Sequence, residues 1–437
     1  MSEATPDISV FFHEYVNQQC LCGQTVWQPR MGFGNPDHMK AGLKAVADEK
    51  EFSRSGTITL DAYTRVGDYK TPLTSLKAGV ALNGYPIVSH GGETTVDVLS
   101  PARIAGIPVQ IRHGTSRPQT IFKRMAELGL DATEGGPISY CLPYGRLPLS
   151  EAVDAWKESC LIMASEIEHG HIESFGGCMM GQLCAPSVLV AISIIEALFF
   201  FHYGISSASL SYAQGTSDEQ DKGAITALRQ LAQEYLPQNS WHIVFYMYMG
   251  VFPVTPAGAS RLIFDAASLA VRSGCERVIV KTVSEAIQIP TVEQNIDALR
   301  LSAASGNQLA HEQLSAVELH HRDEVYAEAK LIIDAMLNES SDPGKAITNC
   351  FKQGLLDVPY CLHADNQGMT RTYIDGEGCL RWADSGKLPI STNISYFGKQ
   401  KPLTTKAFLA MLSYKSRKYD ELAHMDCSGP FWDGEQQ

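Results

Sequence analysis

Three arginines in this chain stand in short segments that could bind a ligand with two negative charges. The segments are Gln28-Pro29-Arg30, Asp61-Ala62-Tyr63-Thr64-Arg65 and Ile111-Arg112-His113-Gly114. A guanidinium group is a planar fork that holds a carboxylate through two hydrogen bonds, which a lysine cannot do. Three such forks brought together would suit a substrate with two carboxylates. Surface arginines in weak ion pairs are the alternative, and three arginines together at strand ends count against it.

The segment from Glu134 to Tyr144 gathers groups that can transfer protons or orient a ligand. It reads Glu134-Gly135-Gly136-Pro137-Ile138-Ser139-Tyr140-Cys141-Leu142-Pro143-Tyr144. Glycines let a ligand approach the backbone closely, and a carboxylate with two phenols can accept, donate and orient hydrogen bonds. A Gly-Pro turn flanked by packing tyrosines is the alternative, and this segment alone leaves both open.

Lys281 and Glu285 are four residues apart, a spacing that on a helix gives an ion pair worth about 0.2–0.5 kcal/mol. The pair would be functional only at the mouth of a site. Lys281 also follows an expected strand, where a lysine could form a Schiff base, as in barrel aldolases.

The sequence does not predict a metal site. The histidine clusters are Glu168-His169-Gly170-His171 and His320-His321, and neither is followed by ligands at a recognised spacing. We expect both clusters to be exposed to solvent. Cys20 and Cys22 have the wrong spacing for a Cys-x-x-Cys site. The 11 cysteines are too dilute for a disulfide scaffold and are expected to be reduced thiols.

These residues belong to an acidic chain of ordinary globular composition. It has 437 residues, 44% of them hydrophobic and 19% charged, which excludes a disordered or coiled-coil protein. Its formal net charge of −13 argues against binding to nucleic acid or to an anionic membrane. No signal peptide is recognisable. The most apolar run, Val188–Phe201, is interrupted by Ser193 and Glu196 and is shorter than the roughly 20 residues that a bilayer requires. We therefore expect a buried helix there, and a soluble cytoplasmic enzyme.

Short β-branched runs alternate with helical patterns over more than 200 residues, which favours a parallel α/β fold. The expected strands are Thr57–Leu60, Pro108–Ile111, Ala208–Tyr212, Ile243–Tyr246 and Val278–Val280. The expected helices are Ser116–Leu130, Ser150–Glu168, Pro186–Tyr203, Glu219–Tyr235 and Ala257–Ser273.

Two parallel α/β folds compete, a doubly wound sheet and a (β/α)8 TIM barrel. No Gly-x-Gly-x-x-Gly joins a strand to a helix, as a dinucleotide-binding sheet would require. Charged residues instead follow several different strands: Arg65, Arg112, Lys281 and, after Asp131-Ala132-Thr133, Glu134. Catalytic groups at the carboxyl ends of many strands are typical of a barrel. We therefore predict a barrel over residues 1–325 and a C-terminal α+β appendage over residues 326–437, packed on the barrel. The appendage includes a hairpin around Asp375-Gly376.

Taken together, the motifs resemble the large (epsilon, catalytic) subunit of adenosylcobalamin-dependent glutamate mutase, also called methylaspartate mutase. The resemblance covers most of the chain from about Thr25. Its segments are Gln28–Gly32, Thr59–Arg65, Leu82–Pro86, Arg112–Thr115, Glu134–Tyr140, Pro143-Tyr144, Gly250–Pro253, Val278–Thr291 and Gly378–Arg381.

The resemblance implies a TIM barrel that closes over the adenosyl face of cobalamin. Arg30, Arg65 and Arg112 would grip the two carboxylates of glutamate. His113, Glu134, Tyr140 and Tyr144 would complete the substrate site, with Glu134 at the substrate amino group as the catalytic residue. The cofactor-contacting positions would be Gly32, Asn83, Pro143, Phe252, Lys281, Glu285 and Ile289. The resemblance implies that Lys281 and Glu285 lie near the adenosyl ribose. That role would replace the ion-pair and Schiff-base alternatives.

The implied activity is a radical isomerisation that interconverts L-glutamate and 3-methylaspartate. The family holds cobalamin in a separate small subunit, whose Asp-x-His-x-x-Gly motif supplies the cobalt-ligating histidine. None of the 13 histidines here has an aspartate two residues before it. The chain should therefore need a small cobalamin-binding partner, and the family pairs two large with two small subunits, so a homodimer of large subunits is expected.

Two stretches depart from the family pattern, Ser174–Met180 and Tyr212–Gly215, and they leave the substrate preference open. A sister mutase acting on another amino dicarboxylate in secondary metabolism, and a non-catalytic barrel relative, remain alternatives. The three arginines and Glu134, all present, argue against the second.

Overall fold

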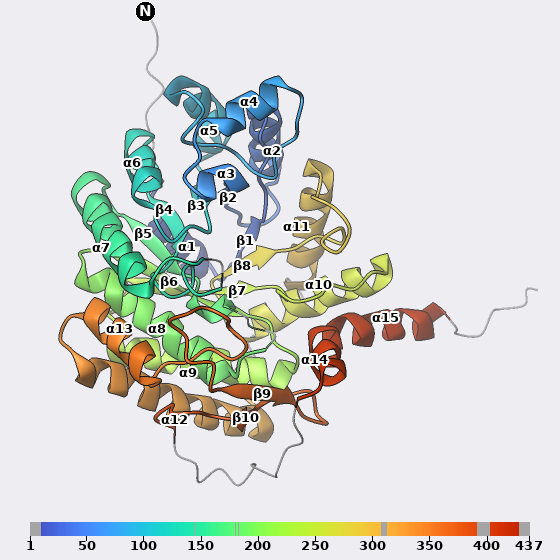
Figure 1. The fold of residues 1–437 in the computed structure, drawn as a ribbon. Coiled ribbons are helices and arrows are strands. Elements are labelled where there is room, and N and C mark those ends of the chain that lie inside the picture. Colours follow the sequence, from blue (N-terminus) through green and yellow to red (C-terminus); the bar gives the residue numbers. More distant parts are fainter. Residues whose placement is uncertain are drawn as a thin grey trace, which may run out of the picture.

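A barrel of eight parallel strands forms the centre of the molecule (Figure 1). The computed structural model describes residues 10–143, 145–179, 181, 183–306, 313–390 and 403–427, with only the backbone for residues 425–427. The strands are β1 (Val26–Pro29), β2 (Gly56–Thr59), β3 (Val109–Arg112), β4 (Ala132–Gly135), β5 (His171–Ser174), β6 (Ser207–Ala213), β7 (Trp241–Tyr246) and β8 (Arg277–Val280). Each strand pairs with the next in sequence from β2 to β8, and β8 pairs with β1.

Backbone hydrogen bonds between the first two strands close the barrel. The Trp27 amide donates to Ser53 O at 2.9 Å, and the Ser55 amide donates to Trp27 O at 3.2 Å. Further along, the Thr59 amide donates to Met31 O at 2.8 Å. The predicted (β/α)8 barrel is thereby confirmed, and all strand carboxyl ends lie at one end of it, where such barrels carry their active sites.

Helices surround the strands and fill the connections between them (Figure 1). They are α2 (Pro36–Asp48), α3 (Ala62–Arg65), α4 (Thr71–Lys77), α5 (Gly92–Ala105), α6 (Gln119–Glu127), α7 (Leu149–Glu166), the 3-10 turn η1 (Gly176–Cys178), α8 (Pro186–His202), α9 (Asp218–Tyr235), α10 (Pro256–Arg272) and α11 (Val292–Gly306). Before them, α1 (Phe12–Leu21) packs at the opposite end of the barrel, where the Phe12 ring lies 4.9 Å from the Arg277 guanidinium.

The five strands and five helices expected from the sequence are confirmed within a few residues at each end. Strands β1 and β5 were not predicted, because polar residues interrupt their apolar sequences. Gln28, His171 and Glu173 are fully buried, and Gln28 and Glu173 bond to side chains of other strands inside the barrel. A strand whose inward face is polar gives no apolar pattern.

Helix α8 is buried on nearly all sides, as its apolar sequence indicates. One face covers the barrel and another packs against α12 (Ala316–Glu339), which also packs against α9. No helix among the described residues is long and apolar enough to cross a membrane. Burial between protein layers therefore accounts for the composition of α8.

The chain after the barrel packs against its helices (Figure 1). After α12 come α13 (Pro343–Gln353), the predicted hairpin of β9 (Arg371–Ile374) and β10 (Leu380–Asp384), α14 (Thr405–Leu412) and α15 (Tyr414–Cys427). The Gln220 side chain of α9 exchanges two hydrogen bonds with the backbone of Leu380, at 2.8 and 2.9 Å. The division into two domains at residue 325 stays a prediction, since α12 runs through that position.

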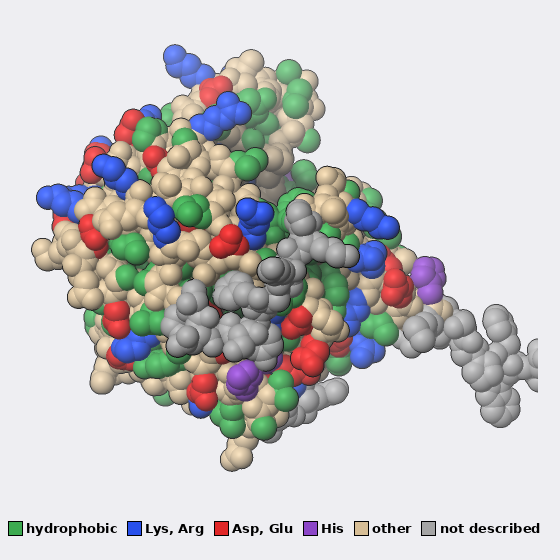
Figure 2. All heavy atoms as spheres, turned by 60° about the horizontal axis from the view of Figure 1, so that its bottom comes forward, with side chains coloured by type: hydrophobic (Ala, Val, Ile, Leu, Met, Phe, Trp, Pro, Cys, Tyr) green, Lys and Arg blue, Asp and Glu red, His purple; other side chains and the backbone are tan. Residues whose placement is uncertain are grey.

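On the face drawn in Figure 2, the basic and acidic side chains of the described residues are interspersed. They do not gather there into the broad basic surface that nucleic-acid binding requires.

Candidate active site

The three arginines singled out in the sequence lie at the carboxyl end of the barrel. Arg30 directly follows β1, Arg112 ends β3, and Arg65 ends the short helix α3 that follows β2. The Asp61 carboxylate begins α3 by accepting the amides of Tyr63 and Thr64, at 2.9 and 3.1 Å. The resulting turn directs Arg65 back, so that its Nε donates to Leu60 O at 3.0 Å.

The arginines are close enough for their charges to act on one another. Burial lowers the pKa of Arg65, and the positive charges of Arg112 and Arg30 lower it further. Among the described residues, no carboxylate forms an ion pair with Arg65. Arg112 is buried and keeps its Nη1 without a hydrogen-bond partner among those residues. Partly buried guanidinium groups with unpaired donors create a strong preference for an anion.

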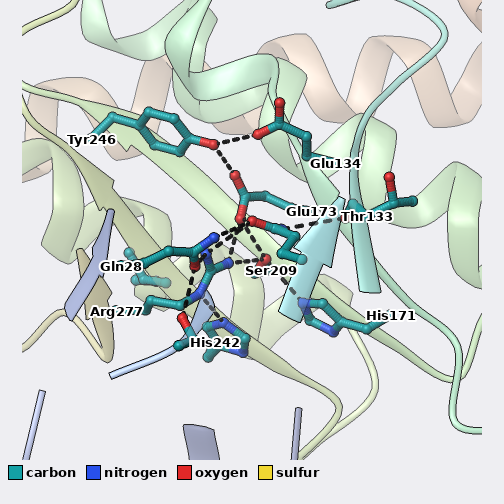
Figure 3. Close-up of polar contacts among 12 residues, drawn as sticks. Gln28, Thr133, Glu134, His171, Glu173, Ser209, His242, Tyr246 and Arg277 are labelled. Carbon is teal, nitrogen blue, oxygen red and sulfur yellow. Dashed lines mark hydrogen bonds and ion pairs between the residues drawn. The ribbon is translucent and has the colours of Figure 1, made fainter. Parts of the chain in front are cut away.

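Glu134, on β4, accepts hydrogen bonds from three different parts of the barrel. Arg112 Nε donates to its Oε2 at 2.6 Å, and the Tyr246 hydroxyl of β7 donates to the same oxygen at 2.8 Å (Figure 3). The Tyr140 hydroxyl donates to Oε1. Burial lowers the pKa of Arg112, but the Glu134 carboxylate together with Tyr246 and Tyr140 outweighs burial and raises the pKa well above its usual value.

Two glycines after Glu134 make room for this arrangement. Gly135 has a φ of 130°, and a side chain there would lie 2.5 Å from the Tyr140 ring. A side chain on Gly136 would lie 2.1 Å from the Glu196 carboxylate of α8. Glu196 needs that space, because it accepts the amides of Ile138 and Ser139 at 3.0 and 2.8 Å and so fixes the turn that carries Tyr140.

His113 is a buried, neutral hydrogen-bond donor next to the arginines. Burial and the charge of Arg65 lower its pKa to about 3. The Thr115 amide donates to its Nδ1 at 3.1 Å, which places the ring proton on Nε2. That Nε2 is buried and has no partner among the described residues. Its ring stands edge-on to Tyr140 with centroids 5.2 Å apart, so His113 lies beside the substrate residues predicted from the sequence.

Lys281, Glu285 and Arg30 form a charged group beside a pocket of about 520 Å³. Glu285 Oε1 accepts from Arg30 Nη1 at 2.7 Å and lies 3.0 Å from Lys281 Nζ. Burial lowers the pKa of Lys281 to about 8, although Glu285 opposes the shift. The Lys281 ammonium lies 5.3 Å from the centre of the Phe252 ring, and Phe252 lines the pocket.

The other predicted cofactor positions are less closely joined to this group. Asn83 Oδ1 accepts the Ala62 amide at 3.1 Å, at the start of α3. Gly32 packs so closely on β2 that a Cβ there would lie 2.4 Å from Thr59 O. Pro143 is half-buried, and Ile289 is exposed between β8 and α11. Tyr144 lies outside the described residues.

Comparisons with known proteins show the family of this chain. A family model described as methylaspartate mutase E chain matches residues 7–409. The chain belongs to the methylaspartate mutase E chain family.

Curated relatives carry a matching name. The glutamate mutase epsilon subunit of Escherichia coli O157:H7 is 31% identical over 393 residues, which cover 85% of this chain and 79% of the relative. The same-named protein of Treponema denticola is 30% identical over 401 residues, covering 87% and 81%. Among solved structures, Proteus mirabilis N-acetylneuraminate lyase aligns with 91% of this chain and 98% of its own, at 10% identity and a TM-score of 0.32.

In this member of the methylaspartate mutase E chain family, the burial of the histidine clusters differs from the sequence prediction. His171 is fully buried in β5 and bonds to Ser207 and Ser209 at 2.9 and 3.1 Å. His321 is buried on α12. The prediction that both clusters are exposed to solvent was therefore wrong for His171 and His321, because both side chains are packed against other elements. The ten cysteines whose side chains the structure describes are free thiols.

Three further functional candidates in this family member were not predicted from the sequence: Tyr246, Glu173 and Arg277. They join the floor of the site to Glu134 (Figure 3). Tyr246 ends a predicted strand, so strand-end position was a signal that could have found it. Glu173 and Arg277 lie inside β5 and β8, and no local pattern marks an ion pair across a barrel.

Proposed function

We propose that this chain is the catalytic subunit of an adenosylcobalamin-dependent radical mutase that interconverts L-glutamate and 3-methylaspartate. The observation that carries the proposal is a set of unpaired donors at one end of the barrel. These are Arg112 Nη1 and His113 Nε2, and beside them lies the Arg65 guanidinium, which forms no ion pair with a carboxylate among the described residues. They surround a carboxylate, Glu134, that could pair with the ammonium group of an amino acid.

In the proposed site, Arg30, Arg65 and Arg112 bind the two substrate carboxylates, with His113, Tyr140 and Tyr144 beside them. Glu134 contacts the substrate amino group and holds or accepts its proton. The donor set is rigid, since Glu134 and Arg112 are already bonded to each other at 2.6 Å. Such preorganisation orients the substrate without further ordering of side chains.

The pocket beside Lys281 is compatible with the adenosyl part of the cofactor. Glu285 could accept hydrogen bonds from ribose hydroxyl groups, with Lys281 keeping its charge in place. Phe252 offers an apolar face, and exposed aliphatic side chains lie close by in the sequence: Val251, Val254, Ile287 and Ile289. When bound, adenosylcobalamin supplies the radical that starts the rearrangement. Gly32, Asn83 and Pro143 are the remaining proposed contacts.

A small cobalamin-binding subunit is the proposed partner. Within these 437 residues no histidine has an aspartate two positions before it, so no Asp-x-His-x-x-Gly motif is present to ligate cobalt. We propose that the partner supplies that histidine, that large subunits form a homodimer, and that the whole is a heterotetramer in the cytoplasm.

The test is an anaerobic assay of the full chain with a small cobalamin-binding subunit, adenosylcobalamin and L-glutamate. We expect 3-methylaspartate to form only in the complete mixture. Product without the small subunit would contradict the two-subunit proposal. Turnover of another amino dicarboxylate, with none of glutamate, would favour the sister mutase. If the mixture turns over no amino dicarboxylate at all, the proposal that the chain is a catalytic subunit is rejected.

A further inference from the structure

The hydroxyl group of Tyr246 lies at a junction of charged residues. It donates to Glu134 Oε2 at 2.8 Å and also contacts Glu173 Oε1 (Figure 3). Arg112 Nη2 donates to the same hydroxyl at 3.4 Å, and the Arg112 guanidinium lies 5.3 Å from the centre of the Tyr246 ring. Tyr246 therefore touches both members of the Arg112–Glu134 pair.

A fully buried ion pair anchors Tyr246 from below. Glu173 on β5 pairs with Arg277 on β8, and neither side chain is exposed to solvent. Arg277 also donates to Gln28 Oε1 at 2.6 Å and to Ser209 Oγ at 2.9 Å, while Gln110 Nε2 donates to Glu173 Oε2 at 3.0 Å. Because these partners come from β1, β3 and β6, the anchor is tied to strands all around the barrel.

Glu134 needs this third contact to stay available for the substrate. Arg112 holds Glu134 through Nε alone, while its Nη2, on the same edge of the guanidinium, donates to the Tyr246 hydroxyl at 3.4 Å. Arginine and carboxylate prefer a two-pronged pairing, so an unrestrained Glu134 would turn to accept from both nitrogens. That movement would turn the Glu134 carboxylate toward Arg112 and away from the proposed place of the substrate amino group.

We propose that Tyr246, held by Glu173 and Arg277, is a positioning residue that occupies Arg112 Nη2 and keeps Glu134 facing the substrate. This inference rests on the role given to Glu134 in the proposed function. Tyr246 acts through Glu134 and needs no contact with the substrate.

The first test compares Tyr246→Phe with Tyr248→Phe in the complete anaerobic assay. Tyr248 is a matched control because it lies two residues further along the same segment, and its buried hydroxyl has no partner among the described residues. We expect Tyr246→Phe to lower kcat by about 10- to 100-fold, as misplaced catalytic groups do, with a smaller change in KM. Tyr248→Phe should leave both unchanged. An unchanged kcat for Tyr246→Phe, or an equal loss in both variants, would overturn the proposal.

A double variant separates positioning from a general structural role. If Tyr246 acts through Glu134, Tyr246→Phe should slow the Glu134→Gln enzyme little further, because residues that act as a unit are not additive. Full multiplication of the two losses would contradict the proposal.

A crystal structure of the Tyr246→Phe chain tests the geometry without any activity. We expect the Glu134 carboxylate to turn and pair with both Nε and Nη2 of Arg112. An unmoved carboxylate would overturn the proposal even if kcat falls. If the wild-type mixture turns over no glutamate, the proposed function fails, and the crystal structure still decides the positioning role.

Discussion

In the proposed site, Arg65 is a basic residue that serves ligand binding and not the fold. Among the described residues its Nε bonds to a backbone carbonyl, and burial together with the charges of Arg112 and Arg30 lowers its pKa. We expect Arg65→Met to lower kcat/KM for glutamate by about 10- to 100-fold, the loss of a charged hydrogen bond. The midpoint of thermal unfolding should not fall, because the variant removes a charge that two other arginines repel.

The control for Arg65 is Arg261→Met, which removes an exposed arginine paired with Asp265 on α10. Both activity and thermal midpoint should stay unchanged in that variant. A normal kcat/KM in Arg65→Met would exclude Arg65 from the substrate site.

Glu134 carries the proton-handling role in the proposed reaction. Glu134→Gln keeps the shape of the side chain but cannot accept a proton from the substrate amino group. We expect kcat to fall by about 100-fold or more, measured as 3-methylaspartate formed under saturating glutamate. The matched variant Glu127→Gln changes an exposed carboxylate at the end of α6 and should be fully active. Equal activity of the two variants would remove Glu134 from the proposed mechanism.

Among single residues, those at strand ends can be predicted from the sequence more readily than those that face the barrel interior. Arg112, Glu134 and Lys281 were found because each ends, or lies next to, a short buried strand. Arg277 and Glu173 form their pair across 104 residues of sequence. No spacing rule covers such a distance, so this part of the site depends on the closed barrel.

The turn that follows β4 is held by the chain beyond the barrel. Helix α7 begins after Pro148 without a side-chain cap of its own, and the Leu149 amide donates to Asp365 Oδ2 at 2.7 Å. His363 Nε2 contacts Leu147 O at 2.9 Å, and the Cys361 thiol donates to Leu142 O at 3.5 Å. The segment around residues 361–365 thus braces the loop that includes the predicted contact Pro143.

Asp365→Ala should loosen that loop. Because the variant removes a distant helix cap, we expect the free energy of unfolding to fall by about 1 kcal/mol in a denaturant titration. The KM for glutamate should rise as the loop becomes less ordered. Asp323→Ala, which changes an exposed residue of α12, should alter neither quantity. A lower stability with an unchanged KM would show that the brace serves only the fold.

Among the helices and strands, those that are amphipathic or wholly apolar can be predicted from the sequence. Helix α8 and strand β6 are predicted because nearly all their side chains are buried. Helix α6 is shorter than expected, since its first turn begins only after Pro118 and it ends at Glu127. Short α3 was not expected at all, because its four residues are defined by the Asp61 cap and not by a repeating pattern.

For the whole molecule, the sequence predicts the barrel but not how its centre is filled. A core of glutamine, glutamate, arginine and serine from five strands takes the place of aliphatic layers around Arg277. The attachment of the C-terminal elements also depends on distant polar contacts. Thr216 of the barrel bonds to Gly378 O at 2.5 Å, next to the hairpin.

The contact between α12 and the β9–β10 hairpin should make stability depend on pH. His321 lies 3.7 Å from the Cys379 thiol and 3.7 Å from Glu324 Oε2, and these two partners raise its pKa to about 9. Glu324 also pairs with Arg381 of the hairpin at 2.8 Å, which keeps the carboxylate in place. A histidine whose pKa is raised on folding stabilises the protein fully below its ordinary value of 6.5 and loses that contribution as pH rises through about 9.

Unfolding by denaturant at a series of pH values between about 6.5 and 9 measures this contribution. The wild-type chain should lose stability across the series, and His321→Gln should lose less, because glutamine does not titrate. His320→Gln is the matched control, since it changes the neighbouring, exposed histidine of the same helix turn and should follow the wild-type curve. Parallel curves for wild type and His321→Gln would mean that the buried imidazole is neutral throughout, and that Arg381 with Glu324 is the ion pair that joins the hairpin to α12.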